Sequence, residues 1–197
     1  MSTPNDRLAH LVNDYITRYK PHADKETQYY QKFLTLEDCI HHAALARNSN
    51  GKRHPHQRRL SQNVLEQVSL TLLRRVSEIA AVADFDGLIE IVSDSVVRGF
   101  GELAIYDTAD RIGAWRGVRP KKVYLHEGTQ VGARALGLQS KQRVLDRMAF
   151  PIALQALEAS DIENFLCLYK HCFKDDQTSF TTGPCSGVKL PLRSTFC

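Results

Sequence analysis

The chain has 197 residues, of which 43% are hydrophobic and 24% charged, the composition of a soluble globular protein. No apolar run approaches the roughly 20 residues of a membrane-spanning helix, and the N-terminus lacks the charged and apolar regions of a signal peptide. We therefore expect a cytoplasmic protein without a membrane partner. The net charge of +4 does not by itself require a nucleic-acid partner, so the distribution of charge along the chain carries more information.

The five cysteines form no Cys-x-x-Cys pair. Their odd number, in a chain without a signal peptide, predicts reduced thiols rather than a disulfide framework. Zinc could be assembled from a group of cysteines and histidines, but their spacing fits no common ligand pattern. This group is Cys39, His41, His42, His54 and His56. We expect neither a metal nor another cofactor.

Residues 1–34 form a lead-in segment whose apolar residues recur with a helical period as far as Pro21. These apolar residues are Leu8, Leu11, Val12, Tyr15 and Ile16. The next helix is predicted to start at Thr35, which suits the N-cap position and is followed by an acidic residue three positions later. Leu34 is placed for an apolar staple, and the Asn-Ser-Asn-Gly sequence at 48–51 ends the helix.

The segment 52–59 contains four Lys and Arg residues, two histidines and no acidic residue, and it lies between two predicted helices. The fixed φ of Pro55 favours an extended, protruding loop. Arginine and histidine on such a loop suit contacts with phosphate groups, although solubility alone, or helix capping by a histidine, would also account for them. The candidate phosphate-binding residues are Lys52, Arg53, His54, His56, Arg58 and Arg59.

Ser61 is expected to cap the next helix, and a wide apolar stripe from Val64 to Ala80 predicts that this helix lies at the centre of the core. Residues 83–86 then form a turn and a cap for a short apolar helix. No segment alternates apolar and polar residues over more than a few positions, and residues 122–126 are the nearest candidate for a strand. This series of capped helices predicts an all-α fold.

Two glycines surround one apolar residue in Gly99-Phe100-Gly101, with helical patterns on both sides. We expect a tight hairpin that joins two helices, because Gly99 and Gly101 can both adopt positive φ without penalty. Amides at the start of the second helix would then point outward towards an anion, most simply a phosphate. On that helix Asp107 and Arg111 lie four residues apart and could pair. Asp107 is interpreted either as a structural carboxylate or as an acid near bound DNA.

After the hairpin, His126 and Glu127 are predicted to lie at a helix N-terminus, where a neutral imidazole could act as an acid, a base or a phosphate donor. A lone histidine is nevertheless more often a structural group. Gly137 is expected to end that helix. A capping box at 160–163 predicts a last helix, and the polar residues 174–197 are expected to form a disordered or loosely attached tail.

The hairpin and the segment after it resemble the helix-hairpin-helix DNA glycosylase superfamily. In that superfamily a small residue, here Ala104, follows the Gly-apolar-Gly hairpin, and a later helix closes on Leu-Gly-Leu, here residues 136–138. The position similar to the catalytic aspartate of the superfamily holds His126. The catalytic lysine found just after the hairpin in bifunctional members is replaced by Glu102 and Leu103.

This resemblance implies an all-α domain over residues 35–173 with a helix-hairpin-helix element, and it implies sequence-tolerant contact with duplex or damaged DNA through the phosphate backbone. A first alternative is an enzyme, a divergent monofunctional DNA glycosylase. In that case His126 would replace the aspartate, and Asp107 or Glu127 would be the carboxylate that orients water. A second alternative is a non-catalytic helical module that binds another protein. The oligomeric state is left open.

Overall fold

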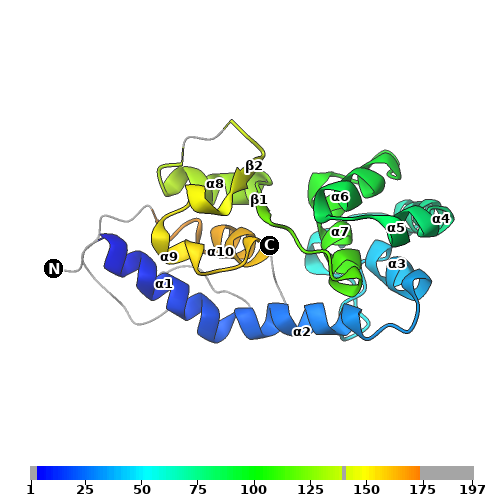
Figure 1. The fold of residues 1–197 in the computed structure, drawn as a ribbon, viewed down its shortest axis with the longest axis horizontal. Helices are drawn as coiled ribbons and strands as arrows, with labels where there is room; N and C mark the ends of the chain where they lie inside the picture. The colour runs from blue at the N-terminus through cyan, green and yellow to red at the C-terminus, as the bar shows by residue number, and fades with distance from the viewer. Residues whose placement is uncertain (1–3, 139–140, 174–197) are drawn as a thin grey trace. The chain divides into compact units, whose positions relative to one another are not determined.

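The computed structural model describes residues 4–138 and 141–173, and these residues are mostly helical (Figure 1). This agrees with the predicted all-α class. The expected tail, residues 174–197, lies outside the described residues. The described residues divide into two compact units: a first unit of residues 4–20, 122–138 and 141–173, and a second unit of residues 21–121. This division differs from the single domain expected over residues 35–173, so each unit is described by itself.

The second unit is a cluster of helices joined by short connections. They are α2 (Lys20–Gln31), which belongs to this unit from residue 21 on, α3 (Leu36–Ala44), the 3-10 turn η1 (Pro55–Gln57), α4 (Gln62–Arg74), α5 (Val76–Ala81), α6 (Phe85–Asp94) and α7 (Glu102–Arg116). Helix α3 packs against α4 and α7, and α6 also packs against α7 (Figure 1). Helix α7 is therefore the element around which the second unit is built.

Three helices of the second unit begin where the sequence predicts. The side-chain oxygen of Thr35 accepts a hydrogen bond from an amide in the first turn of α3 at 3.1 Å. Ser61 does the same for α4 at 3.3 Å, and Asp84 for α6 at 2.9 Å. Each oxygen satisfies an amide that has no acceptor inside its helix. These starts were readable from the sequence because capping depends only on neighbouring residues.

Two local predictions in the second unit are wrong. Leu34 does not staple α3, because its side chain is 94% exposed. Phe33 makes the apolar contact instead, with its ring centroid 4.6 Å from that of His42. The single core helix expected from Ser61 to Ala80 is divided at Arg75, whose guanidinium donates to the Ile91 carbonyl at the end of α6. A tertiary contact thus accompanies a break that the apolar stripe does not reveal.

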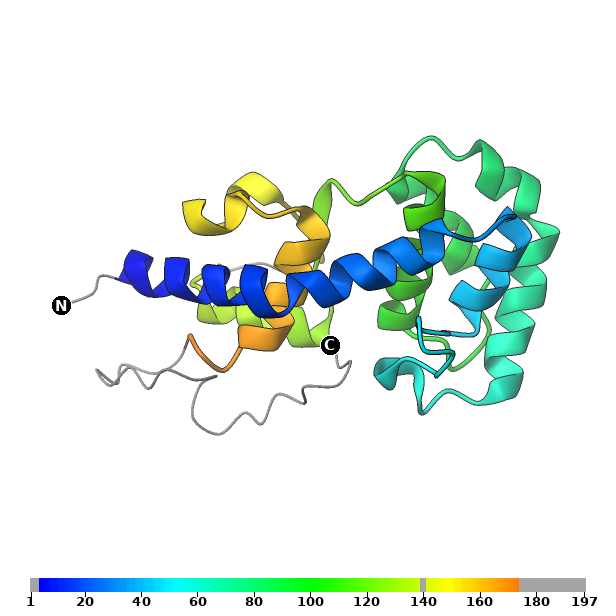
Figure 2. The same ribbon diagram turned by 90° about the horizontal axis from the view of Figure 1, so that it is seen from below.

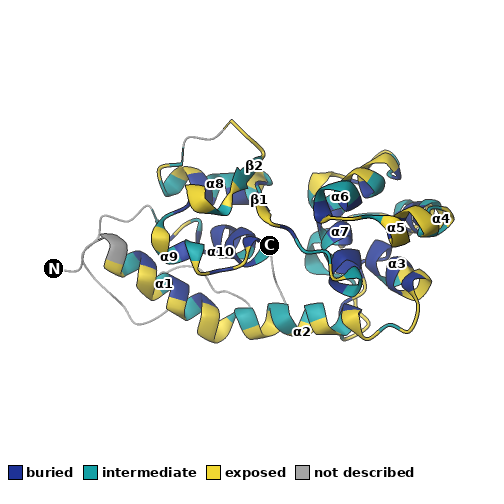
Figure 3. Ribbon diagram, viewed as in Figure 1, coloured by how far each residue is buried: buried dark blue, intermediate teal, exposed yellow. Residues whose placement is uncertain are grey.

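The core of the second unit gathers on α7, where buried residues occupy most sides of the helix (Figure 3). Apolar side chains from α3, α4 and α6 surround it. They include Cys39, Ile40, Leu65, Val68, Leu72, Leu88 and Val92, which are all buried. Because α7 is enclosed in this way, the turn that precedes it is fixed in place by the core.

The first unit combines the N-terminal helix with all elements after residue 121. They are α1 (Pro4–Arg18), β1 (Lys122–Tyr124), α8 (Glu127–Ala135), β2 (Val144–Asp146), the 3-10 turn η2 (Arg147–Ala149), α9 (Ile152–Gln155) and α10 (Ala159–Tyr169). Strands β1 and β2 pair antiparallel, with Val123 opposite Leu145. This small sheet forms at the segment that the sequence marks as the nearest candidate for a strand.

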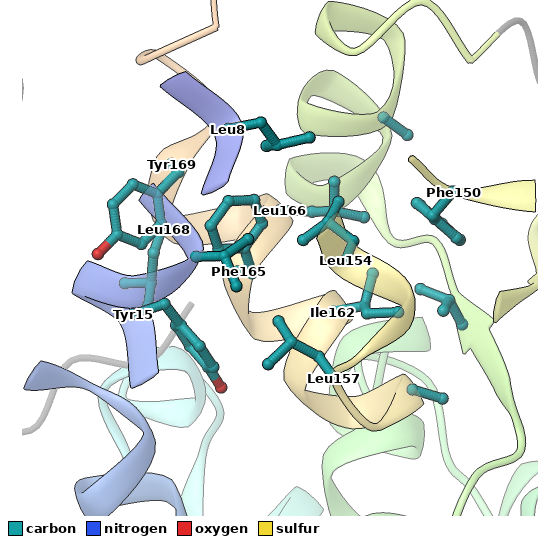
Figure 4. Close-up of a cluster of buried hydrophobic side chains, with 14 of the residues drawn as sticks. Leu8, Tyr15, Phe150, Leu154, Leu157, Ile162, Phe165, Leu166, Leu168 and Tyr169 are labelled. Atoms are coloured by element: carbon teal, nitrogen blue, oxygen red, sulfur yellow. The ribbon is translucent and has the colours of Figure 1, made fainter. Parts of the chain in front are cut away.

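Helix α1 belongs to the first unit because its apolar face is buried against the C-terminal elements. Leu8, Val12 and Tyr15 join a cluster that includes Phe165 (Figure 4), and Figures 1 and 2 both place α1 beside α9 and α10. The Tyr15 hydroxyl also donates to Asp161 at 2.8 Å. The lead-in helix α1 ends at Arg18, and α2 begins at Lys20. Pro21 lies in the first turn of α2, where the missing N–H of proline costs little because it would have no acceptor inside the helix.

The predicted capping box at 160–163 is wrong. Helix α10 already begins at Ala159, with Glu158 at the N-cap and no side-chain cap bond. Asp161 is buried inside the unit, where it accepts from Tyr15 and lies 3.1 Å from the ammonium of Lys20. Asp161, which directly follows the expected cap Ser160, is therefore part of a tertiary polar cluster.

Two cysteines of the first unit, Cys167 and Cys172, are disulfide-bonded. The expectation of reduced thiols is wrong for these two residues, because the pairing of cysteines depends on tertiary proximity, which their spacing does not show. Cys39 of the second unit is a buried free thiol, and burial raises its pKa to about 12. No helix in the described part of the chain is long and apolar enough to cross a membrane.

Candidate nucleic-acid interface

The turn between α6 and α7, residues 95–101, has one glycine in a conformation that requires glycine. Gly99 has φ +101°, whereas Gly101 has φ −84°. Only Gly99 therefore adopts positive φ, and Gly101 does not need a conformation that favours glycine. Phe100 between them is buried, and its amide donates to the Val97 carbonyl at 3.1 Å. This buried ring holds the turn on the core and leaves both glycines exposed.

Gly101 is the N-cap of α7 and has no side chain that could accept from the first turn. Its carbonyl accepts the first helical bond, from Ile105 at 3.0 Å. The first amides of an α-helix have no acceptor inside the helix, and they carry the positive end of the helix dipole. An N-terminus capped by glycine is therefore suited to an anion, and α7 presents one directly after the turn.

The basic loop is fixed to α7 by a polar network. Gln57 of η1 is buried; its amide nitrogen donates to Asp107, and its amide oxygen accepts from Arg111 at 3.1 Å. The Arg111 guanidinium also lies 3.3 Å from Asp107 and donates to the Ala43 carbonyl at 3.4 Å. The predicted pair of Asp107 and Arg111 is confirmed. Asp107 thus has the structural role that the sequence offered as one of two readings.

Two basic-loop residues point inward rather than outward. The Arg53 guanidinium donates to the Leu60 carbonyl at 2.8 Å and to the Gln62 side chain, so it ties the two ends of the loop together. The His54 amide donates to the Ala46 carbonyl at 2.8 Å. The loop is therefore folded back on itself, and the extended, protruding shape expected from Pro55 is wrong, because these bonds close it.

His54 is held neutral inside the second unit. Its Nε2 lies 3.5 Å from a carboxylate oxygen of Glu26, a distance that would suit an ion pair. Burial, followed by the proximity of Arg111 and His56, nevertheless lowers the pKa of His54 to about 2. The imidazole is therefore uncharged at neutral pH, and His54 does not supply the cation that the sequence suggested.

The remaining basic residues of the loop face outward. Lys52, Arg58 and Arg59 are exposed, and His56 is half-buried with its Nδ1 3.8 Å from Asp107. Arg98, an exposed residue of the turn, is a further cation that was not singled out from the sequence, although it directly precedes Gly99.

An open pocket of about 470 Å³ joins the basic loop to α7. It is lined by Pro55, His56, Arg58, Arg59 and Leu103. Leu103 is the second residue of α7, so the two arginines lie beside the helix N-terminus described above. The structure thus brings together the loop and the hairpin, two candidate segments that are separated by about 40 positions and that no local sequence pattern connects.

The candidate catalytic residues are divided between the units. His126 is the N-cap of α8, and Glu127 is the first residue of that helix, as predicted, but the His126 side chain makes no cap bond. Gly137, with φ +81°, ends α8 in the predicted way. Asp107 belongs to the second unit, whereas His126 and Glu127 belong to the first. The three are therefore not assembled within either unit.

In the part of the chain that the structure describes, no three His, Cys, Asp or Glu side chains gather as a metal site. The group considered for zinc has other contacts. His41 is bonded to Ser69, and His42 to Tyr29, both at 3.1 Å. The Cys39 sulfur lies 3.9 Å from the Arg111 carbonyl.

No protein-family model, curated protein or solved structure matches the chain. We therefore infer function from the geometry and charge of the second unit.

Proposed function

We propose that the protein binds DNA through a helix-hairpin-helix element formed by α6, the turn 95–101 and α7, and that it contacts the phosphate backbone with little sequence preference. The observation that carries this proposal is the pocket in which Arg58 and Arg59 lie beside Leu103, in the first turn of α7. A helix N-terminus and two guanidinium groups, brought to one surface, form a site for phosphate.

Each part of this surface recognises phosphate rather than bases. Backbone amides and arginine side chains contact phosphates in all sequences alike, which gives affinity and position but little sequence information. Glu102 places one carboxylate in the same helical turn and opposes this attraction. Lys52, Arg58, Arg59 and Arg98 are all exposed on the loop and the turn, so cations outnumber that single acid.

The arginines are presented on a rigid support. The polar network of Gln57, Asp107 and Arg111 fixes η1 to α7, so the loop does not have to be ordered when the ligand binds. We do not extend the proposal to base excision. Asp107 is occupied in this network and belongs to a different unit from His126.

The proposal is tested with the double variant Arg58→Ala/Arg59→Ala and a fluorescent duplex titrated at several salt concentrations. The parent should bind more weakly as salt rises, because phosphate contacts release counterions. Loss of two phosphate contacts should reduce the slope of log affinity against log salt by about 2. The matched control is Lys32→Ala/Arg74→Ala, which also removes two exposed cations from the second unit.

The control residues lie away from the turn. Arg74 is the last residue of α4. The turn lies near the opposite end of α4, because a Cβ added to Gly99 would lie 4.0 Å from the side chain of Val64. Lys32 is next to Phe33, whose carbonyl accepts a hydrogen bond from the Trp115 side chain. Trp115 lies near the C-terminal end of α7, whereas the turn precedes the N-terminal end of that helix. Equal losses in both double variants would mean that net charge alone, and not this surface, binds DNA. Absence of binding at low salt would instead favour a protein-interaction module.

A further inference from the structure

We propose that the pocket between the basic loop and α7 accepts one unpaired nucleotide, so that the protein prefers DNA with a bulged or single-stranded nucleotide over a continuous duplex. This inference rests on the proposed DNA-binding function and names the class of DNA that the site selects. The pocket carries neither His126 nor Glu127, so the inference is independent of any excision chemistry.

The lining of the pocket has two different chemistries. Arg58 and Arg59 provide positive charge, whereas Pro55 and Leu103 provide apolar surface. The two arginines attract a phosphate group, whereas the apolar surface of Pro55 and Leu103 gives a phosphate group no favourable contact. A continuous duplex presents phosphates outward and keeps the faces of its bases stacked inside the helix. The apolar surface therefore has no partner on paired DNA, but it matches the base and sugar of an unpaired nucleotide.

The size of the pocket also fits a nucleotide better than a phosphate alone. Its volume of about 470 Å³ lies in the range of small-molecule sites, roughly 300–1,000 Å³. A base could lie on Pro55 and Leu103, while its own phosphate lies at the two arginines. Stacking and apolar contact of this kind depend little on base identity, because every base has an apolar face. The preference should therefore be for an unpaired nucleotide rather than for a particular base.

The walls of the pocket are set by the fold. Pro55 begins η1, whose Gln57 is buried and bonded to α7, and Leu103 lies in the first turn of α7 itself. His56 is positioned by its proximity to Asp107, at 3.8 Å. Because these positions are fixed before the ligand arrives, little conformational entropy is lost on binding.

The experiment compares two duplexes of the same length that carry the fluorescent base 2-aminopurine. In one duplex this base is bulged without a partner, and in the other it is paired. Affinity is measured from the anisotropy of a dye at the far end of each duplex. We expect the bulged duplex to bind about tenfold more tightly, the size of one base contact. The emission of 2-aminopurine should change on binding only in the bulged duplex.

The variant Leu103→Ser removes the apolar wall without altering charge. It should reduce the ratio of the affinities for bulged and paired duplex, measured on the same variant, from about tenfold to less than about twofold. If melting shows that this variant is unfolded, Leu103→Ala serves in its place, because alanine favours helix. The control is Ile152→Ser, which removes an apolar side chain that is 79% exposed on α9, outside the pocket.

The outcomes distinguish this inference from the function on which it rests. Equal affinity for the two duplexes would overturn the inference and leave the proposed DNA binding intact. A preference that survives in the folded Leu103 variant would also overturn it, because the unpaired base would then lie elsewhere. Failure to bind either duplex at low salt would overturn the proposed function itself.

Discussion

At the scale of single residues, the two glycines of the turn have different roles, and one substitution made at each should separate them. Gly99→Ser should lower the free energy of unfolding by about 1–3 kcal/mol, because φ +101° is unfavourable for any residue with a Cβ. Gly101→Ser should leave stability unchanged or raise it by a few tenths of a kcal/mol, since serine is the better N-cap. A Cβ at Gly101 meets no atom within 4 Å. Urea denaturation measures both effects.

Gly101→Ser also tests whether the first amides of α7 contact phosphate, as the proposed DNA binding requires. A serine hydroxyl at position 101 would accept a hydrogen bond from an amide in the first turn of α7 and would compete with phosphate for it. Gly101→Ser should therefore weaken DNA binding without loss of stability. If this variant is as stable as the parent and binds duplex equally well, the amides of α7 do not contact the phosphate.

His54, whose side chain is only 15% exposed, predicts a dependence of stability on pH. The pKa of His54 is lowered from 6.5 to about 2 in the folded protein, so below pH 6.5 the unfolded chain binds a proton that the folded chain does not. The contribution of His54 to stability is therefore fully present above pH 6.5 and is lost progressively as the pH decreases towards 2. Replacing His54 by Gln should reduce the slope of unfolding free energy against pH between 6.5 and 5, by on the order of 1 kcal/mol per pH unit.

The slope is the informative quantity for His54, because the substitution also alters packing and so changes absolute stability. The slope of unfolding free energy against pH is obtained from urea denaturation at a series of pH values. His22→Gln, at an exposed position of α2, controls for the removal of a histidine. An unchanged slope in His54→Gln would show that His54 is not held neutral by the fold.

At the scale of secondary-structure elements, the contact between α8 and α10 depends on a glycine. A Cβ at Gly132 would lie 2.4 Å from the Leu166 carbonyl oxygen, closer than any real contact. Gly132→Ala should therefore destabilise the protein by about 1–3 kcal/mol through overpacking. This occurs although alanine is favoured over glycine within a helix by about 1 kcal/mol.

Gly128→Ala, on the same helix, is a milder substitution whose effect on stability can be compared with that of Gly132→Ala. Its Cβ would meet only side-chain atoms, the sulfur of Cys167 at 3.3 Å and the ammonium of Lys170 at 3.5 Å. Lys170 is flexible and can move aside, so this substitution should cost less. If Gly132→Ala proved more stable than the parent in thermal unfolding, the two helices would not be in close contact.

At the scale of the whole molecule, the division into two units predicts that residues 21–121 fold alone. This segment is continuous in sequence, has its own buried core, and contains both the turn 95–101 and the basic loop. The isolated fragment should unfold cooperatively on heating and should bind duplex DNA. A fragment that is unfolded by circular dichroism would show that its core depends on the first unit.

The disulfide-bonded cysteines distinguish the two units in a reducing environment. Cys167 and Cys172 lie in the first unit, so treatment with dithiothreitol should lower the stability of the full chain by about 2–5 kcal/mol per disulfide lost. The fragment 21–121 contains only the free thiol of Cys39 and should not respond. Alkylation of these two cysteines without reductant, detected by mass spectrometry, would contradict the bonds.

These disulfide bonds also bear on the cellular location. Disulfide bonds persist mainly in oxidising compartments and are rare in the cytosol. The disulfide-bonded Cys167, on α10, and Cys172, after its last residue, are therefore unusual for the cytoplasmic location expected from the sequence.

The sequence by itself determined the features that depend on neighbouring residues. The helix starts at Thr35 and Ser61, the pair of Asp107 and Arg111 and the stop at Gly137 all follow from spacings of two to four positions. The mostly helical class follows from the apolar period, since that period reflects one buried face on each helix.

Only the tertiary structure decided which distant segments lie together. It buried α1 against α10, placed Arg58 and Arg59 beside Leu103, and divided the chain into two units. It also turned His54 inward, although a histidine in a basic loop reads as an exposed cation. The physical reason is that the charge state and the partners of a side chain depend on its burial, and burial results from contacts between residues that are far apart in the sequence.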